Sequence, residues 1–185
     1  MKDLIVDWPQ GLELFLREKP SGIVQSSLYS LNTNSKSFNS VISSVYGLSI
    51  KWSPKGDKML YSKTSSTGES IGIYIANRSG TNEKSANVST LTEKCVWSQD
   101  IRYIYCAVPK NINDAKLLPD DFYKGTFIGD DEFYKINTET GEKTNVLADE
   151  TMNETYDATD LFLSPSEDYL MFINKGDGLL YSIKL

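Results

Sequence analysis

The sequence predicts an all-β protein built from four repeats of one stranded unit, and three observations support this prediction. A tryptophan recurs in a similar setting at Trp8, Trp52 and Trp97, in steps of 44 and 45 residues. A tyrosine recurs inside another apolar run, in steps of 45, 60 and 47 residues, at Tyr29, Tyr74, Tyr134 and Tyr181. The apolar runs are short and bounded by Gly, Pro, Asn and Ser, which is typical of strands joined by turns. Two anchors that agree on one period indicate a repeat.

Each repeat begins with an apolar strand that runs into a polar turn, and a second apolar strand follows directly. The first strands and their turns cover residues 6–11, 50–57, 95–100 and 161–168. The second strands cover residues 14–16, 59–61, 103–105 and 169–173. In the fourth repeat, Leu163 stands where the other three have tryptophan. We expect the two strands of each repeat to pair, with the tryptophans packed between neighbouring repeats.

The recurring tyrosine marks a third strand in every repeat, at residues 28–31, 73–76, 133–136 and 180–183. A polar turn follows three of these strands, most clearly at residues 77–80 and 137–141, and leads to a fourth strand. No convincing stretch of helical periodicity extends beyond two turns. About 40 to 45 residues that hold four antiparallel strands have the size of one blade of a β-propeller. We therefore predict a β-propeller, with a β-sandwich of similar strand count as the alternative.

The four predicted blades form one repeat domain over residues 1–185, with approximate bounds at 1–46, 47–93, 94–152 and 153–185. They close as a small four-bladed ring or form the C-terminal part of a larger propeller. An open arc would expose an apolar blade face at each end, and a second copy or a partner would have to cover those faces. The fourth repeat reaches Leu185 directly after its third strand, which favours the larger propeller.

The second repeat carries a family resemblance. Residues 52–62, followed by residues 73–75, resemble the TolB-like repeat of WD-repeat-like propellers, which reads aromatic-Ser-Pro-Asp-Gly and continues into an apolar strand and an Ile-Tyr strand. Lys55 replaces the usual aspartate, and the other three repeats keep only part of the pattern. The resemblance implies a propeller fold, a bacterial source and an extracytoplasmic location, in the periplasm or cell envelope. It implies no particular role.

The composition excludes several classes of function. The chain of 185 residues has 19 Lys and Arg against 25 Asp and Glu, a net charge of −6, so we expect no binding to nucleic acid. It has no histidine, which excludes Ser-His-Asp and Cys-His catalysis and histidine-based metal sites. No apolar run is long enough for a membrane-spanning helix. We expect no cofactor and no metal, and a non-enzymatic scaffold that binds a protein or another ligand, or associates with itself.

The third repeat contains an insertion at residues 109–129, between its second and third strands. Loops of this length inside compact domains are usually functional or disordered, and the apolar content of this one argues against disorder. We expect the insertion to lie at the mouth of the propeller channel and to bind a partner. The candidate binding residues are Asp120, Asp121, Phe122, Tyr123 and Lys124. The weightier alternative is structural: the insertion tucks its aromatic side chains onto the blade.

Acidic residues supply two further hypotheses. The groups 120–121 and 130–132, with Asp157 and Asp160, have the ligand type that calcium prefers but not a calcium-loop spacing, so a solvated acidic rim is the preferred interpretation. A pair of carboxylates flanking one deep pocket would instead indicate a carbohydrate-active or otherwise hydrolytic propeller. A structural fragment without a ligand of its own is the third alternative.

Two cysteines lie near each other in the predicted third blade. If Trp52 faces Met59 across its turn, the same register one repeat later pairs Trp97 with Ile104 and sets Cys95 opposite Cys106. Cross-strand neighbours are close enough for a disulfide after a modest adjustment, in an oxidising compartment. Two buried thiols beside Trp97 are the preferred interpretation, and the disulfide is the alternative.

Overall fold

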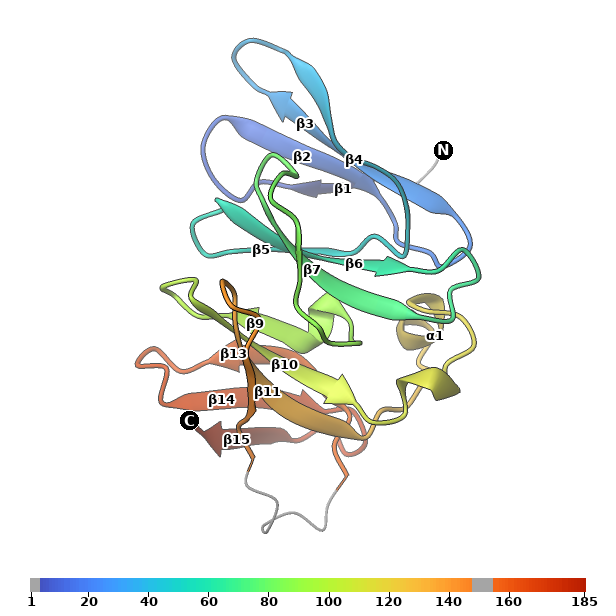
Figure 1. The fold of residues 1–185 in the computed structure, drawn as a ribbon, viewed down its shortest axis with the longest axis vertical. Helices are drawn as coiled ribbons and strands as arrows, with labels where there is room; N and C mark the ends of the chain where they lie inside the picture. Colours follow the sequence, from blue (N-terminus) through green and yellow to red (C-terminus); the bar gives the residue numbers. More distant parts are fainter. Residues whose placement is uncertain (1–3, 148–154) are drawn as a thin grey trace.

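The computed structural model describes residues 4–147 and 155–185, so the blade boundary predicted at residues 152 and 153 lies outside the described residues. It contains four antiparallel sheets that follow one another along the chain and stack face to face (Figure 1). Within each sheet the strands lie in sequence order. This stack of four small sheets differs from the two-layer β-sandwich considered as an alternative.

The first sheet contains β1 (Leu4–Asp7), β2 (Glu13–Glu18), β3 (Gln25–Asn32) and β4 (Phe38–Tyr46). The second contains β5 (Ile50–Trp52), β6 (Lys58–Thr64), β7 (Ile71–Asn77) and β8 (Lys84–Ser85). The third contains β9 (Cys95–Trp97), β10 (Tyr103–Pro109), β11 (Asp131–Asn137) and β12 (Lys143–Asn145). The fourth contains β13 (Ala158–Leu163), β14 (Tyr169–Asn174) and β15 (Leu180–Lys184). Three short helical turns accompany them: η1 (Thr92–Lys94), η2 (Ile112–Asp114) and α1 (Asp120–Tyr123).

The serine of the repeated motif closes the turn after the first strand of each of three sheets. Its hydroxyl accepts a hydrogen bond from the amide at the start of the next strand, as Ser53 does from Lys58 at 3.1 Å. Ser98 and Ser164 act in the same way. The turn also needs one residue with positive φ, which is Gly56 in the second sheet. The third and fourth sheets place non-glycine residues in this conformation, and their turns therefore depart from the motif.

The apolar core consists of three layers, one between each pair of neighbouring sheets. Trp52 packs against Phe15 of the first sheet, with ring centroids 4.4 Å apart. Trp97 is buried against the second sheet, and Leu163 packs in the layer between the third and fourth sheets. Trp8 differs from the expectation: it is 65% exposed, because no described sheet lies before the first one to cover it.

The recurring tyrosines occupy the third strand of every sheet and help to fill the same layers. Tyr74, Tyr134 and Tyr181 each pack in the layer between their own sheet and the sheet before it in the chain. No sheet of the described residues precedes the first one, and Tyr29 stacks instead on Phe38 of its own sheet, with ring centroids 5.0 Å apart. The same side chain therefore occupies an equivalent position in every repeat.

The four sheets form an open arc. The first and the last sheet lie at opposite ends of the stack, so the described residues form no closed four-bladed ring (Figure 1). Of the two arrangements considered from the sequence, the small closed ring is not the one observed.

Candidate functional site

The insertion is anchored by an apolar cluster of its own. Leu118, Phe122 and Phe127 are buried together with Ile71 of β7 and Leu91, which precedes η1. The insertion runs beside the ends of the second and third sheets (Figure 1). Buried aromatic and aliphatic side chains fix it there, as the tucked-loop alternative describes.

Hydrogen bonds tie the insertion to loops of the first and second sheets. The Asp120 carboxylate accepts from the Gly22 amide at 2.8 Å and from the Ser21 hydroxyl at 3.2 Å. The Leu118 amide donates to the Gly68 carbonyl at 2.8 Å. Gly22 permits this close approach, because a Cβ atom there would lie 2.2 Å from the Leu118 carbonyl oxygen.

A buried ion cluster lies beneath the insertion and joins the third and fourth sheets. The Lys94 ammonium donates to Asp131 and to Asp157 at 2.6 Å each, and none of the three side chains is more than 3% exposed. Lys175 lies 3.3 Å from Asp157. The ring of Phe122 covers the cluster, with its centroid 4.6 Å from the Lys175 nitrogen. The insertion therefore contacts groups from all four sheets.

Burial dominates the electrostatics of this cluster. It raises the pKa of Asp131 to about 6, against the opposing effect of the Lys94 ammonium and of the hydrogen bond from the Ala158 amide. One Asp131 oxygen, Oδ1, is buried and has no hydrogen-bond partner. Such a group stabilises the fold only while its cation is in place.

A second polar network fixes the tyrosine of the insertion. The Tyr123 hydroxyl donates to Glu93 at 2.5 Å, and the Ser49 hydroxyl donates to the same carboxylate at 2.7 Å. Desolvation of its hydroxyl inside this network, together with the charge of Glu93, raises the pKa of Tyr123, although the side chain as a whole is 40% exposed. This network joins the insertion to the residues that lead into β5 and β9.

The five candidate residues are therefore used mainly within the molecule. Asp120 holds the loop of the first sheet, and Asp121 accepts from the amides of Lys116 and Leu117 inside the insertion. Phe122 is buried, whereas Tyr123 and Lys124 are exposed.

The expectation of a solvated acidic rim is wrong for two of its residues. Asp131 and Asp157 are buried around Lys94 and are not solvated, because each faces a cation in the interior. Asp130 pairs with Lys110, and Glu132 accepts from the Tyr134 hydroxyl. The described residues contain no group of three or more His, Cys, Asp or Glu side chains arranged to hold a metal ion.

The sequence reasoning missed Lys94. One feature of the sequence could have indicated its role: Lys94 stands directly before the predicted strand at Cys95, where the chain enters the interior between two sheets.

A pocket of about 340 Å³ opens beside the insertion. Its lining includes Pro20, Ser21, Val24 and Asp120, and therefore combines the loop between β2 and β3 with α1. Ile23 and Val24 on that loop are exposed apolar side chains. We call the insertion together with loop residues 19–24 the insertion face.

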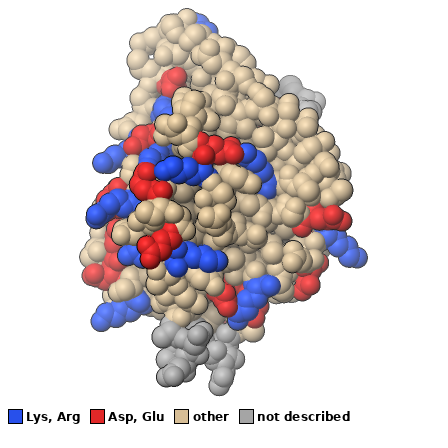
Figure 2. Space-filling view, viewed as in Figure 1, with Lys and Arg blue, Asp and Glu red and all other residues tan. Residues whose placement is uncertain are grey.

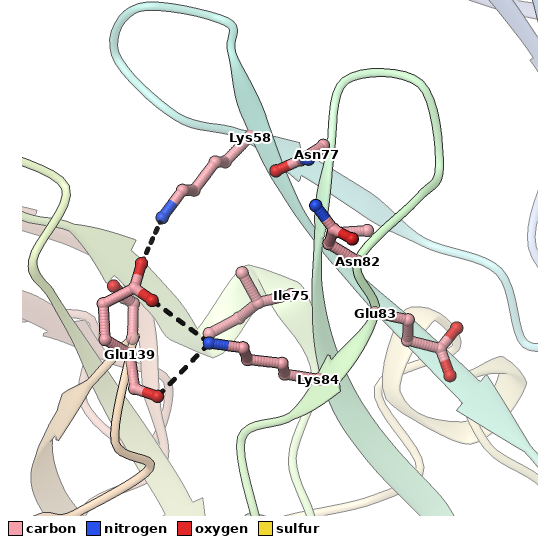
Figure 3. A pocket seen from close by; sticks show the side chains of 9 residues that line it. Lys58, Ile75, Asn77, Asn82, Glu83, Lys84 and Glu139 are labelled. Atoms are coloured by element: carbon pink, nitrogen blue, oxygen red, sulfur yellow. Dashed lines mark hydrogen bonds and ion pairs between the residues drawn. The ribbon is translucent and has the colours of Figure 1, made fainter.

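A second pocket, of about 450 Å³, lies between the second and third sheets, and residues that line it form ion pairs with one another (Figure 3). Lys58 and Lys84 both donate to Glu139, at 2.8 and 3.1 Å. These lysines lower the pKa of Glu139 to about 2. Figure 2 shows the same alternation of basic and acidic side chains over the middle of the molecule. We interpret this pocket as a structural contact between the second and third blades, because its lysine and glutamate side chains already form ion pairs with each other.

The cysteines have the register that the sequence predicted, with Trp97 opposite Ile104 and Cys95 opposite Cys106. Their sulfur atoms are joined in a disulfide, which corrects the preference for two thiols. Both residues are buried in the layer between the second and third sheets.

Solved structures identify the fold. A chain described as TolB from Agrobacterium tumefaciens superposes with a TM-score of 0.63 at 15% identity, over 99% of this chain and 58% of that one. The fold is that of TolB-like β-propellers. A chain of a nidogen–laminin complex superposes on this chain with a TM-score of 0.60 at 9% identity, over 99% of this chain and 61% of that one. An oligogalacturonate lyase from Vibrio parahaemolyticus matches with a TM-score of 0.56 at 13% identity, over 92% and 44% of the two chains.

The chain spans about half the length of these structures. No protein-family model matches its sequence, and no curated protein does so. In the described part of the chain, no helix is long and apolar enough to cross a membrane.

Proposed function

We propose that this TolB-like propeller is a non-enzymatic binding scaffold whose insertion face binds a protein partner. The insertion is held by hydrogen bonds, an ion cluster and a small apolar core, so its surface is rigid before binding. A rigid surface loses little conformational entropy when a partner binds. The nidogen–laminin complex, in which one chain has a similar fold, is an association of proteins and supports the proposal.

The exposed apolar side chains beside the Asp120 pocket carry this proposal. Ile23 is 61% exposed although its neighbour Gly22 is fixed by Asp120. Val24 lines the pocket, and exposed Tyr123 belongs to the same insertion face. The rest of the pocket lining is mostly polar or charged, with Glu18, Lys19 and Gln25 beside Asp120. Exposed apolar side chains beside a polar hollow are typical of a protein-binding surface.

The carboxylates argue against the hydrolytic alternative. Asp131 and Asp157 lie around one group, the Lys94 ammonium, and both are buried against it. Side chains that are at most 3% exposed are not placed to flank the glycosidic bond of a bound substrate, as this chemistry requires. The lyase with a similar fold makes oligogalacturonate the substrate to test, and we expect no cleavage of it.

Binding can be tested with one substitution and one matched control. Proteins retained by the wild-type chain are first identified by mass spectrometry, and the retained protein is then purified for titration by calorimetry. Ile23→Glu introduces a charge on the insertion face, and we expect at least tenfold weaker binding. Leu12→Glu is the control: Leu12 is 52% exposed and lies in the turn between β1 and β2, at the other end of the strands. Equal affinities of the two variants would disprove the proposed surface.

A further inference from the structure

The first sheet exposes an apolar face that no described element covers. In strands, side chains alternate between the two faces, and Phe15 and Leu28 point toward the second sheet. The register pairs Val6 with Leu16 and Leu16 with Tyr29, so these residues point the opposite way. The face that we call the leading face contains Leu4, Val6, Trp8, Leu14, Leu16, Tyr29, Leu31 and Phe38. Figure 2 shows few charged side chains over this end of the molecule.

The other three sheets use the equivalent face to pack onto the sheet before them. In the second sheet it consists of Ile50, Trp52, Met59, Tyr61, Tyr74 and Ala76, paired in the same register. In the third sheet it includes Trp97, Ile104 and Tyr134, and in the fourth Leu163, Leu170 and Tyr181. The leading face of the first sheet is therefore equivalent to three faces that are each covered by a preceding sheet.

The fourth sheet exposes the complementary face at the other end of the stack. Phe162 pairs with Met171 and Ile173 pairs with Leu180, which places these four side chains on one side of the sheet. With Tyr169 they form what we call the trailing face. The equivalent positions in the second sheet include Leu60 and Ile73, which are fully buried beneath the third sheet. The two free faces are thus the two halves of an interface that occurs three times within the chain.

We propose that a second copy of this chain covers both faces, with the leading face of each copy packed on the trailing face of the other. Two arcs joined head to tail at both ends form a closed ring with two-fold symmetry. Eight blades lie within the range of four to eight that closed propellers adopt. A second copy is the favoured occupant because it carries a trailing face. At three places within the chain, the face equivalent to the trailing face of one sheet packs on the face equivalent to the leading face of the next sheet.

The indole of Trp8 indicates how the two faces meet. In the third sheet, Trp97 donates from Nε1 to the Lys51 carbonyl of the preceding sheet at 3.2 Å, whereas the Trp52 Nε1 in the second sheet is buried without a hydrogen-bond partner. We take the Trp97 interface as the guide to the contact of Trp8. No sheet of the described residues precedes Trp8, and its indole donates to the Gly11 carbonyl of its own turn. By register, the counterpart of Lys51 in the fourth sheet is Phe162. In the assembled ring, the Trp8 indole donates to the Phe162 carbonyl of the second copy.

Size-exclusion chromatography with light scattering tests this inference. We expect the wild-type chain to have twice its 20.8 kDa mass, and Trp8→Glu and Leu180→Glu to be monomers of 20.8 kDa. Trp8 is 65% and Leu180 is 56% exposed, so neither substitution should disturb the isolated fold, which circular dichroism checks. Ile128→Glu is the control: Ile128 is 71% exposed but lies in the insertion, and this variant should remain a dimer.

Mixing the two variants distinguishes head-to-tail association from pairing of like faces. Trp8→Glu keeps an intact trailing face and Leu180→Glu keeps an intact leading face, so their mixture should form a heterodimer through one interface. If the leading faces paired with each other, Leu180→Glu alone would remain a dimer. A monomeric wild-type chain at every concentration would overturn the inference, and a series of ever larger species would overturn the closed ring. Neither Trp8 nor Leu180 lies on the insertion face, so the result is independent of the proposed partner binding.

Discussion

At the scale of single residues, stability depends strongly on Lys94. Its ammonium is the shared partner of two buried carboxylates on different sheets. Lys94→Met would leave Asp131 and Asp157 facing each other, and we expect it to lower the free energy of unfolding by about 3–5 kcal/mol. Urea unfolding measures the loss.

Lys175→Met is the control for this prediction. Lys175 contacts the same Asp157 carboxylate at 3.3 Å, but its side chain is 27% exposed. We expect a loss of about 1 kcal/mol or less, because solvent screens a partly exposed pair. Equal losses in the two lysine variants would mean that the buried position of Lys94 is not the cause.

Asp131 makes a separate prediction about pH. Its pKa in the folded protein is about 6, above the ordinary value of 3.8, so the folded state binds more protons between these two values. This contribution to stability is therefore largest at low pH and is lost as the pH rises through 6. Asp131→Asn removes it, so the stability of the wild type relative to the variant should fall across this window, by about 3 kcal/mol at most. Urea titrations over this pH range provide the measurement, and a difference that is constant with pH would contradict the prediction.

The sequence could predict individual positions where the repeat fixes them. Counting from Trp52 places Cys95 opposite Cys106, and the structure has this pair. It could not predict that Asp131 and Asp157 share one lysine, because they come from different sheets whose relative position depends on packing. The exposure of Trp8 could not be predicted from its motif either, since burial depends on the neighbouring sheet.

At the scale of elements, the close approach of the insertion to the loop between β2 and β3 depends on Gly22. A Cβ atom there would lie 2.2 Å from the Leu118 carbonyl oxygen and 2.9 Å from the Gly68 Cα. Gly22→Ala should displace the insertion and expose its backbone, and we expect trypsin to cleave at Lys116 or Lys124 about tenfold faster. Timed proteolysis with mass spectrometry identifies the cleavage sites.

Gly176→Ala is the matched control. A Cβ atom at Gly176 would meet its nearest neighbour at an ordinary 3.5 Å, and no positive φ requires glycine there. The proteolysis of this variant should equal that of the wild type. If Gly22→Ala were equally resistant, the insertion would not depend on this contact.

The strands were predictable because each one repeats a short apolar run with its own turn signal. The insertion was predictable only as an interruption of that pattern. Its short helix α1 and its contacts with all four sheets depend on side chains that are far apart in sequence, such as Ser21 and Asp120. Local periodicity carries no information about such pairs.

At the scale of the whole molecule, repetition explains both the core and its two open ends. The second and third sheets bury one face on the sheet before them and the other beneath the sheet after them, so the four described sheets leave one face of each kind uncovered. Repeat proteins derive their stability from these nearest-neighbour interfaces. Among the described sheets, the first and the last each lack one such interface.

Association through the end faces would therefore raise the thermal stability of the molecule in proportion to the logarithm of its concentration. When copies bind one another only in the folded state, a tenfold increase in protein concentration stabilises the dimer by about 1.4 kcal/mol and raises its Tm by a few degrees. Differential scanning calorimetry of the wild type across a concentration series should show this rise. Trp8→Glu should have a lower Tm that does not change with concentration, since its first sheet stays uncovered. A wild-type Tm that is equally independent of concentration would show that the missing interfaces are not supplied by a second copy.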